Sequence, residues 1–420
     1  MSAFLFVPRG YMGALAAALL AVSWATAQAQ PLTFERAQAL AEQGAPENIA
    51  QQAQVAAAQL AVGPADALPD PKLLLGVDNV PIEGPDRYRL NREPMTMRRI
   101  GLMQEVPNSD KRHARLQLAK ASVLRAEAEQ RAMQLEIKRQ TALSWLDVYY
   151  AEHSVDLLAQ LDRQIHLLRS TVQSLIAGGR AQPAELLQAD QEALALQDRR
   201  DELRRDVAIA RAKLRRWIGN EADQPLAGAV PSLSLQAPHR LQRMASHPEL
   251  RAASARVGEA SAGLDEAIAE KTPDWGVEVA YNNRDKQFGD MVMVQFTFDL
   301  PLFVGSRQGP RISSRQQNVA QLEAEQEVLL RAHQAELESG LVELEQLRKA
   351  LGRSENDLIP LARQRADLEL AAYQAGNRQL TAVITAQREL IEAQLRQIEQ
   401  QRKLSLLSAN LHYAYVEGLQ

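Results

Sequence analysis

The side chains with the most obvious chemistry in this sequence are its histidines and two pairs of methionines. None of the seven histidines pairs with another at the four-residue spacing of one helical face, and no HExxH zinc motif occurs. Each methionine pair, Met95 with Met97 and Met291 with Met293, places two thioethers on one face of an expected strand. We favour apolar packing for these pairs over a weak Cu(I) or Ag(I) contact, because thioethers commonly fill gaps between apolar groups.

The remaining candidates for chemistry are also weak. Cysteine is absent from all 420 residues, which excludes disulfides, thiolate metal sites and cysteine nucleophiles. Acidic residues are frequent, but they alternate with arginines at helical spacing, which is typical of solvated helix faces. Neither a glycine-rich phosphate loop nor a nucleophile elbow stands out. The sequence therefore predicts a protein that is not an enzyme and that needs no cofactor.

The composition is typical of long packed helices. Hydrophobic residues make up 46% of the chain but aromatic residues only 5%, so the apolar mass is mostly alanine, leucine and valine. Charged residues of both signs make up 24%, and the net charge is -4. Because binding of a polynucleotide depends on a basic excess that displaces counterions, this balance argues against a nucleic-acid partner.

The first 29 residues have the features of a secretory signal peptide. Arg9 supplies a positive start, Tyr11 to Val22 is an apolar stretch of twelve residues, and Ala27 to Ala29 is a small-residue cleavage site. This stretch is too short to span a bilayer as a helix, and no later apolar run approaches about 18 residues. A mature chain that crosses a membrane must therefore do so as a β-barrel. Without a cysteine the chain cannot be lipidated at its N-terminus.

The mature sequence consists of two similar halves. Pro107 and Pro301, which each follow an acidic and an apolar residue, lie 194 positions apart, and Gly179 and Gly376 lie 197 positions apart. These similar offsets predict a duplicated unit with a small insertion or deletion. We divide the chain accordingly into the signal peptide 1–29, a first repeat 30–220, a linker 221–239 and a second repeat 240–420.

Each repeat is expected to contain one very long helix that forms a hairpin with a shorter one. Residues 109–178 contain no proline and would extend roughly 105 Å as a helix; residues 311–376 are the counterpart. Between Leu158 and Leu175 apolar residues recur at alternating spacings of three and four. This pattern predicts that the helix packs lengthwise on another helix. In each repeat two shorter helices together match the long one in length, so we expect them to stack end to end beside it.

Four segments with an alternating apolar pattern predict a small β contribution to a mostly α fold. The pattern is cleanest from Trp275 to Tyr281 and from Val292 to Phe298. Strands of about ten residues cross a bilayer at a tilt. Four strands cannot close a barrel, but three chains would supply twelve. The alternative is a soluble sheet capping a helical rod, with further elements over its apolar face. The expected strands are 72–82, 96–106, 274–284 and 290–300.

Together these features resemble the TolC-like family of outer-membrane efflux proteins, over essentially all of the mature chain. Two short runs, Leu68 to Pro71 and Met95 to Gly101, look like the heavy-metal branch of that family. The resemblance implies one third of a homotrimer, with an α-helical barrel in the periplasm and a 12-stranded β-barrel in outer-membrane lipid. It also implies a periplasmic adaptor (membrane fusion) protein and an inner-membrane RND-type pump as partners, with heavy-metal cations as the expected cargo.

The resemblance also assigns roles to the helical turns. In this family the turns form the periplasmic tip, where the adaptor docks and the channel closes. The matching positions here are Gly179 and Arg180 in the first repeat, and Gly376 and Asn377 in the second. Glycine at a tight reversal tolerates a positive φ angle.

Two further features of the family map onto the second-repeat tip. The family closes the channel with a polar latch of Tyr, Arg and Asp, and the matching positions hold Tyr373, Arg378 and Glu185, an acid longer by one methylene. Charge-assisted hydrogen bonds would hold such a latch, and an ordinary solvated charge pair is the alternative. Several relatives carry a ring of Asp at the constriction, where this chain has Ala382 and Thr385, so an acidic selectivity ring is not expected at that level.

Two other functions remain open. A type I secretion duct or a drug-efflux duct has the same fold and a different cargo, and the sequence barely separates these from metal efflux. A periplasmic adaptor protein belongs to a different class, since it binds rather than conducts. An adaptor has one helical hairpin between lipoyl-like and small β-barrel halves, whereas this chain predicts two hairpins and two strand pairs.

Overall fold

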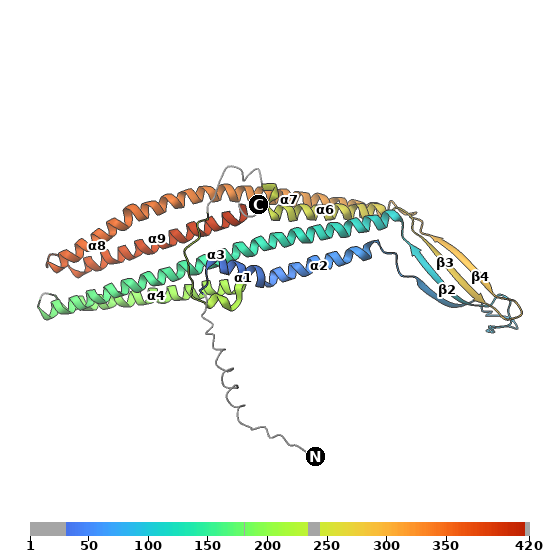
Figure 1. Cartoon of the computed structure of the whole chain (residues 1–420), viewed down its shortest axis with the longest axis horizontal. Helices are drawn as coiled ribbons and strands as arrows, with labels where there is room; N and C mark the ends of the chain where they lie inside the picture. Colours follow the sequence, from blue (N-terminus) through green and yellow to red (C-terminus); the bar gives the residue numbers. More distant parts are fainter. Residues whose placement is uncertain (1–30, 180, 234–243, 416–420) are drawn as a thin grey trace, which may run out of the picture.

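The chain forms an elongated molecule with helices along most of its length and a β-sheet at one end (Figure 1). The computed structural model describes residues 31–179, 181–233 and 244–415. The expected signal peptide and Arg180 lie outside these residues. Within them, no helix combines the length and the apolar character that a helix needs to span a bilayer.

The central element is helix α3 (Ser109–Ala177), which has 69 residues and is therefore about 100 Å long. Asn108 caps its start, because the side-chain oxygen accepts a 2.8 Å hydrogen bond from the backbone of Asp110. The chain reverses at Gly179, whose φ of 71° favours glycine, and helix α4 (Pro183–Ile218) returns along α3. Further neighbours of α3 are α1 (Phe34–Gly44), α2 (Pro46–Asp66), α6 (Pro248–Ala269) and α9 (Leu380–Tyr415).

The second repeat forms a similar hairpin with a discontinuous long helix. Helix α7 (Gln308–Arg353) passes through one π-helical turn (Ser354–Leu358) into α8 (Ile359–Gln374). The turn directly precedes Pro360, which has no backbone N–H to donate, so the wider turn accommodates the proline. Helix α9 then returns beside α8 and α7. Both hairpin tips lie at the end of the molecule opposite the sheet (Figure 1).

The four strands form one antiparallel sheet in the order β1-β2-β3-β4, so the two repeats meet at its centre. The β2–β3 pairing, with Ile100 opposite Tyr281, joins them. Each strand is shorter than its expected range. β1 ends at Asp78 because Asn79 adopts a positive φ of 55°, which turns the chain out of the sheet. The strands are β1 (Lys72–Asp78), β2 (Met97–Val106), β3 (Trp275–Asn283) and β4 (Met291–Phe298).

A mixed aromatic and aliphatic core fixes the middle of the molecule. Trp145 of α3 is fully buried, and its indole N–H donates a 3.3 Å hydrogen bond to the carbonyl of Leu32. Phe34 packs edge-on against the same indole, with ring centroids 5.4 Å apart. Leu32 also forms a parallel bridge with Leu226. These contacts hold the segments before α1 and after α4 against the long helix.

Candidate functional site

The sheet has one exposed apolar face. Side chains that are opposite one another across all four strands point to this face, for example Leu73, Leu102, Val279 and Val294. Each of these four is 49–61% exposed. Soluble chains rarely leave so continuous an apolar patch uncovered. We call this surface the apolar face; it comprises Leu73, Leu75, Ile100, Leu102, Trp275, Val279, Tyr281, Val292, Val294, Phe296 and Phe298.

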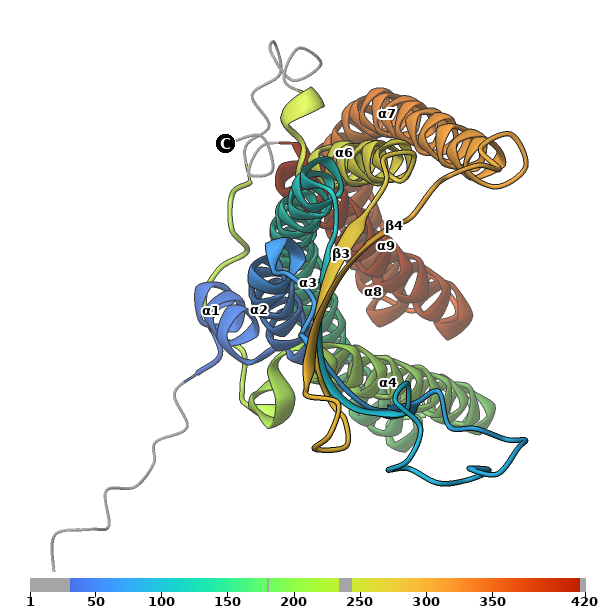
Figure 2. The same ribbon diagram turned by 90° about the vertical axis from the view of Figure 1, so that its right-hand side faces the viewer.

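The opposite face of the sheet is polar and ion-paired. Arg99 lies between two carboxylates, 3.3 Å from Asp78 and 3.4 Å from Glu278. The sheet is strongly curved when seen from its end (Figure 2). Gly101 and Ala280 permit close packing at this face, because a Cβ atom on Gly101 would lie 2.8 Å from that of Ala280. Lys72 and Glu105 form another ion pair on the same face.

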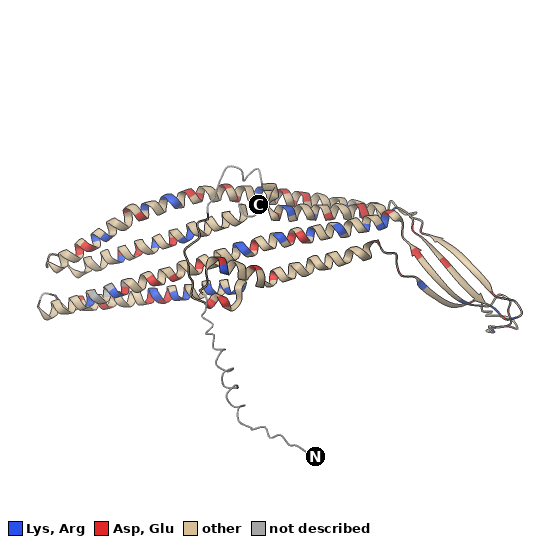
Figure 3. Ribbon diagram, in the orientation of Figure 1, with Lys and Arg blue, Asp and Glu red and all other residues tan. Residues whose placement is uncertain are grey.

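Charge is distributed differently over the rest of the molecule. Lysine, arginine, aspartate and glutamate are scattered with mixed sign along the helices, whereas the strands are mostly uncharged (Figure 3). The helical part therefore has the surface of a water-exposed rod. The boundary between the two surfaces lies where the strands join α3 and α6.

The two methionine pairs do not come together. Met97 begins β2 and the pair Met291 and Met293 lies on β4, so that β3 separates them by about 10 Å. Met95 precedes β2, and its carbonyl accepts a 3.3 Å hydrogen bond from Asn79. A soft-metal site built from all four thioethers does not fit this arrangement.

The structure joins two of the three residues of the expected latch. The phenol of Tyr373 donates a 2.8 Å hydrogen bond to the carboxylate of Glu185, which links the two hairpins near their tips. Burial raises the pKa of Tyr373, and the bond to Glu185 raises it further, so the phenol remains a donor. Glu185 also accepts from the backbone of Gln182 at 3.3 Å and thereby caps α4.

The other tip residues have different partners. The guanidinium of Arg378 lies 3.4 Å from Glu369, within its own hairpin, rather than on Glu185. Gly376 reverses the chain with a φ of 78°, and the backbone of Asn377 closes the turn by donating to the carbonyl of Ala372 at 2.9 Å.

The expected constriction residues lie at the start of α9. Thr385 is exposed, and its hydroxyl donates a 2.9 Å hydrogen bond to the carbonyl of Thr381. Ala382 is half-buried one turn earlier. Neither side chain carries a charge.

A second link between the hairpins was not anticipated from the sequence. Arg388 of α9 binds Glu192 of α4 through two guanidinium nitrogens, one of them at 3.3 Å. Glu192 is almost fully buried, and Arg388 is more exposed. A bidentate pair of this kind fixes the relative position of two helices. The sequence signal for this pair is the separation of its two residues, about 196 positions, which is close to the offset between matching positions of the two repeats.

The structure also assembles a histidine cluster from segments far apart in the sequence. His247 precedes α6, Glu249 lies in its first turn, and His333 comes from α7. One ligand atom from each residue lies within 4.8 Å of the others. Sequence reasoning missed this cluster because it sought histidines at helical spacing; the signal was the His-Pro-Glu triplet at a helix start.

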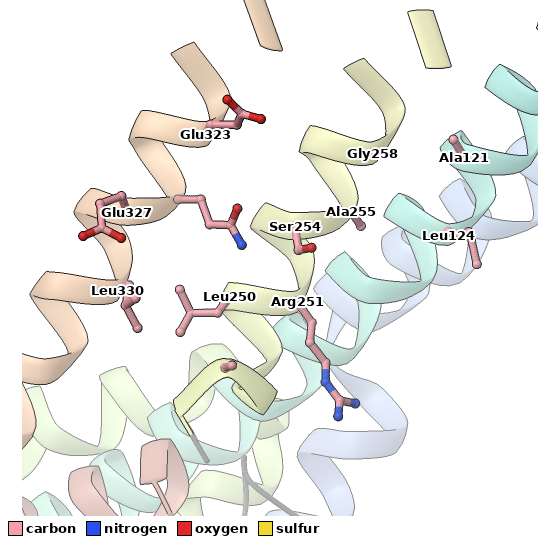
Figure 4. A pocket seen from close by; sticks show the side chains of 12 residues that line it. Ala121, Leu124, Leu250, Arg251, Ser254, Ala255, Gly258, Glu323, Glu327 and Leu330 are labelled. Atoms are coloured by element: carbon pink, nitrogen blue, oxygen red, sulfur yellow. The ribbon is translucent and has the colours of Figure 1, made fainter. Parts of the chain in front are cut away.

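A cleft of ≈ 830 Å³ opens beside this cluster between α3, α6 and α7 (Figure 4). Ala121 and Leu124 line it from α3, and Leu250 lines it from α6. Glu323 and Glu327 of α7 face it from the other side. The cleft therefore has an apolar floor with acidic groups along one wall.

Comparison with known proteins gives a likeness in structure rather than in sequence. No protein-family model matches the chain, and no curated protein matches it. A membrane protein from Pseudomonas aeruginosa has a TM-score of 0.79 at 16% identity, over 91% of this chain and 93% of that one. The outer membrane protein VceC from Vibrio cholerae has a TM-score of 0.75 at 17% identity, over 91% and 95%. The outer-membrane channel OprN has a TM-score of 0.77 at 15% identity, over 91% and 89%.

The chain has the fold of an outer-membrane channel protein. The likeness extends over nine-tenths of its length. It confirms the expected mostly α fold with a four-stranded β contribution. At identities of 15–17% the likeness concerns this channel fold and not cargo or partners.

Proposed function

We propose that the chain is the outer-membrane duct of a tripartite efflux system. The observation that carries the proposal is the apolar face of the sheet, which is uncovered at one end of a helical body about 100 Å long. Such a face is stable in lipid, whereas the ion-paired opposite face suits a water-filled lumen. The alternative of a soluble sheet loses support, because no described element packs over the apolar face.

Three copies of the chain close the barrel in this proposal. Within the described residues, β1 and β4 each pair with one neighbour only, so each presents an unpaired edge. Lipid cannot satisfy the backbone groups of such edges. Joining β4 of one chain to β1 of the next in a homotrimer gives twelve strands without edges.

The helical hairpins form the periplasmic tunnel in the same proposal. The tips, with Gly179, Arg180, Gly376 and Asn377, dock on a periplasmic adaptor protein that is coupled to an inner-membrane RND-type pump. The pump supplies the energy and the duct is passive. The support for this arrangement is the placement of both tips at the end opposite the sheet (Figure 1).

The gate is assigned to the residues that link the hairpins. Tyr373 and Glu185 form the centre of a closed-state latch, and Arg378 completes it from beside Glu369. Ala382 and Thr385 line the constriction without charge, so selection of cations at that level is not expected.

Heavy-metal cations are the proposed cargo, on the resemblance of the run from Met95 to Gly101. Deleting the gene and testing susceptibility to copper, silver, zinc, cobalt, cadmium and antibiotics checks this part. Sensitivity to metals supports it, and sensitivity to antibiotics alone rejects it in favour of a drug-efflux duct.

The membrane assignment is tested with two neighbouring residues of β4. Val294 belongs to the apolar face, whereas Gln295 points to the polar face opposite Glu278. Val294→Arg should cost about 2–4 kcal/mol of membrane stability if the face contacts lipid, and Gln295→Arg should be tolerated. The measurement is the amount of trimer recovered from outer membranes. Equal recovery of Val294→Arg and wild type would reject a lipid-facing sheet, and so would equal loss of both variants.

A further inference from the structure

The histidine cluster lies in the helical body, between the sheet and the hairpin tips, and has no part in the proposed duct function. His247 is 1% exposed and His333 is 7% exposed, with ring centroids 4.4 Å apart. Two imidazoles in contact inside a core are costly unless they share a hydrogen-bond partner or a ligand. The buried Nε2 of His247 makes no well-formed hydrogen bond within the described residues, although the backbone carbonyl of Ala414 acts on the ring.

We propose that His247, Glu249 and His333 form a binding site for a divalent transition-metal ion of the Zn²⁺ type. Two imidazole nitrogens and one carboxylate oxygen are a set of ligands that suits zinc and its neighbours in the first transition row. The three groups lie within 4.8 Å of one another, so modest rotations bring them to the distances of about 2.0–2.2 Å at which these ligands bind zinc. Glu249 is partly exposed and leaves a path for the ion and for a water ligand.

The surroundings of His333 fit a ligand role. Its Nε2 lies 3.2 Å from the Glu249 carboxylate, and its Nδ1 lies 3.1 Å from the hydroxyl of Tyr415. That hydroxyl is also 3.0 Å from Glu336 and can donate to it while accepting from Nδ1–H. Metal-bound histidines commonly donate their other ring N–H in this way. Nε2 faces the Glu249 carboxylate through its proton, and a metal ion would take the place of that proton while Nδ1–H donates to Tyr415.

His247 requires one rearrangement. Its Nδ1 accepts a 3.2 Å hydrogen bond from the backbone N–H of Glu249, which places the ring proton on Nε2. For Nε2 to bind a metal, this proton moves to Nδ1 and the capping bond is lost. The bond is long, and the metal–nitrogen bond replaces it, so binding loosens the start of α6 while joining α6 to α7.

The charges near the site are negative on balance, which favours a cation. Glu249 and Glu336 supply two carboxylates, and Arg139 is a cation that acts on both His247 and Glu249. Arg139 is itself paired with Glu136 at 2.5 Å and donates to Asn410 at 3.0 Å.

The test uses the full chain, purified in detergent, stripped with EDTA and titrated with Zn²⁺ alone by calorimetry. We expect one ion per chain, and Co²⁺ in its place should give the visible absorption of a site with nitrogen and oxygen ligands. Glu249→Gln and His333→Gln should each weaken binding at least tenfold. The matched controls are Glu338→Gln on an exposed position of α7 and His113→Gln on an exposed position of α3, which should bind as wild type.

Several outcomes would overturn the inference. Wild-type protein that binds no Zn²⁺ rejects it directly. Binding that persists in Glu249→Gln and His333→Gln, or that falls equally in His113→Gln, shows attachment to surface histidines instead. Should His333→Gln fail to fold, as judged by circular dichroism, Glu249→Gln decides alone, because its side chain is partly exposed and its replacement keeps the shape.

Discussion

Gly340 of α7 lies so close to Leu411 of α9 that a Cβ atom on the glycine would be 2.9 Å from a leucine methyl group. Leu411 is fully buried, so its side chain has little space to move. The Leu411 side chain thus fills the space beside Gly340, and the two helices of the second repeat pack closely at this level. Such a contact fixes their spacing more firmly than ordinary apolar packing does.

The first prediction concerns this contact. Gly340→Ala should destabilise the protein by about 1–2 kcal/mol, because overpacking outweighs the gain in helix propensity. Gly352→Ala in the same helix is the control: its nearest neighbour would be 4.0 Å away, so it should be neutral or slightly stabilising. Thermal unfolding measures both. A Gly340→Ala variant as stable as Gly352→Ala would mean that Leu411 can move aside.

The second prediction concerns the bond between Tyr373 and Glu185. Tyr373→Phe keeps the ring and removes the donor, so the hairpin tips should separate more often and conductance in planar bilayers should rise. The loss of stability should be about 1 kcal/mol, since Glu185 can be hydrated again. Arg378→Ser should have the smaller effect, because Arg378 contacts Glu369 instead. If conductance is unchanged in Tyr373→Phe, both alone and combined with Glu185→Ala, the two residues do not form a latch.

The third prediction concerns the pair of Arg388 and Glu192. Arg388→Ala should cost about 1–3 kcal/mol, because it leaves a buried carboxylate without its partner. Arg388→Ala combined with Glu192→Gln should recover part of this loss, since no buried charge remains. Arg396→Ala, on an exposed position of the same helix, is the control and should change little. A double variant that is no more stable than Arg388→Ala alone would contradict the pairing.

The fourth prediction is a pH dependence at the junction of helix and sheet. Asp274 accepts hydrogen bonds from Lys111 at 2.7 Å and from the backbone of Asn108 at 2.9 Å. Partial burial opposes its ionisation, but these bonds outweigh it and lower its pKa. The stabilisation is therefore present above the ordinary pKa of about 3.9 and is lost as the pH falls through the lower folded value.

Asp274→Asn should accordingly be less stable than wild type by about 1–2 kcal/mol at pH 7, and by less near pH 2–3. Thermal unfolding at both pH values measures the difference. Asp265→Asn on an exposed position of α6 should be neutral at either pH. A deficit in Asp274→Asn that persists undiminished at low pH would show that shape rather than charge matters at this site.

Periodicity was enough to predict most of the architecture. The proline-free stretch before Pro183 is one helix, α3, because nothing in it interrupts the backbone hydrogen bonds. The alternation in β3 and β4 places apolar residues on one face, as expected from a repeat of two. Patterns of this kind are local, so a sequence displays them without any knowledge of the fold.

Features that depend on packing between distant segments were not predictable in this way. His247 and His333 are 86 positions apart and meet only because α6 packs on α7. Similarly, the sequence suggested Arg378 as a partner of Glu185, but a carboxylate of its own hairpin lies closer.

The unpaired edges of β1 and β4 also have a consequence for genetics. In the proposed trimer, a chain with one edge that cannot pair would still assemble through its other edge and would inactivate the copies beside it. With equal amounts of normal and defective chain mixing at random, only about one assembly in eight would lack a defective copy. An allele that damages one edge strand should therefore be dominant over the wild-type gene, whereas an allele that abolishes expression should be recessive.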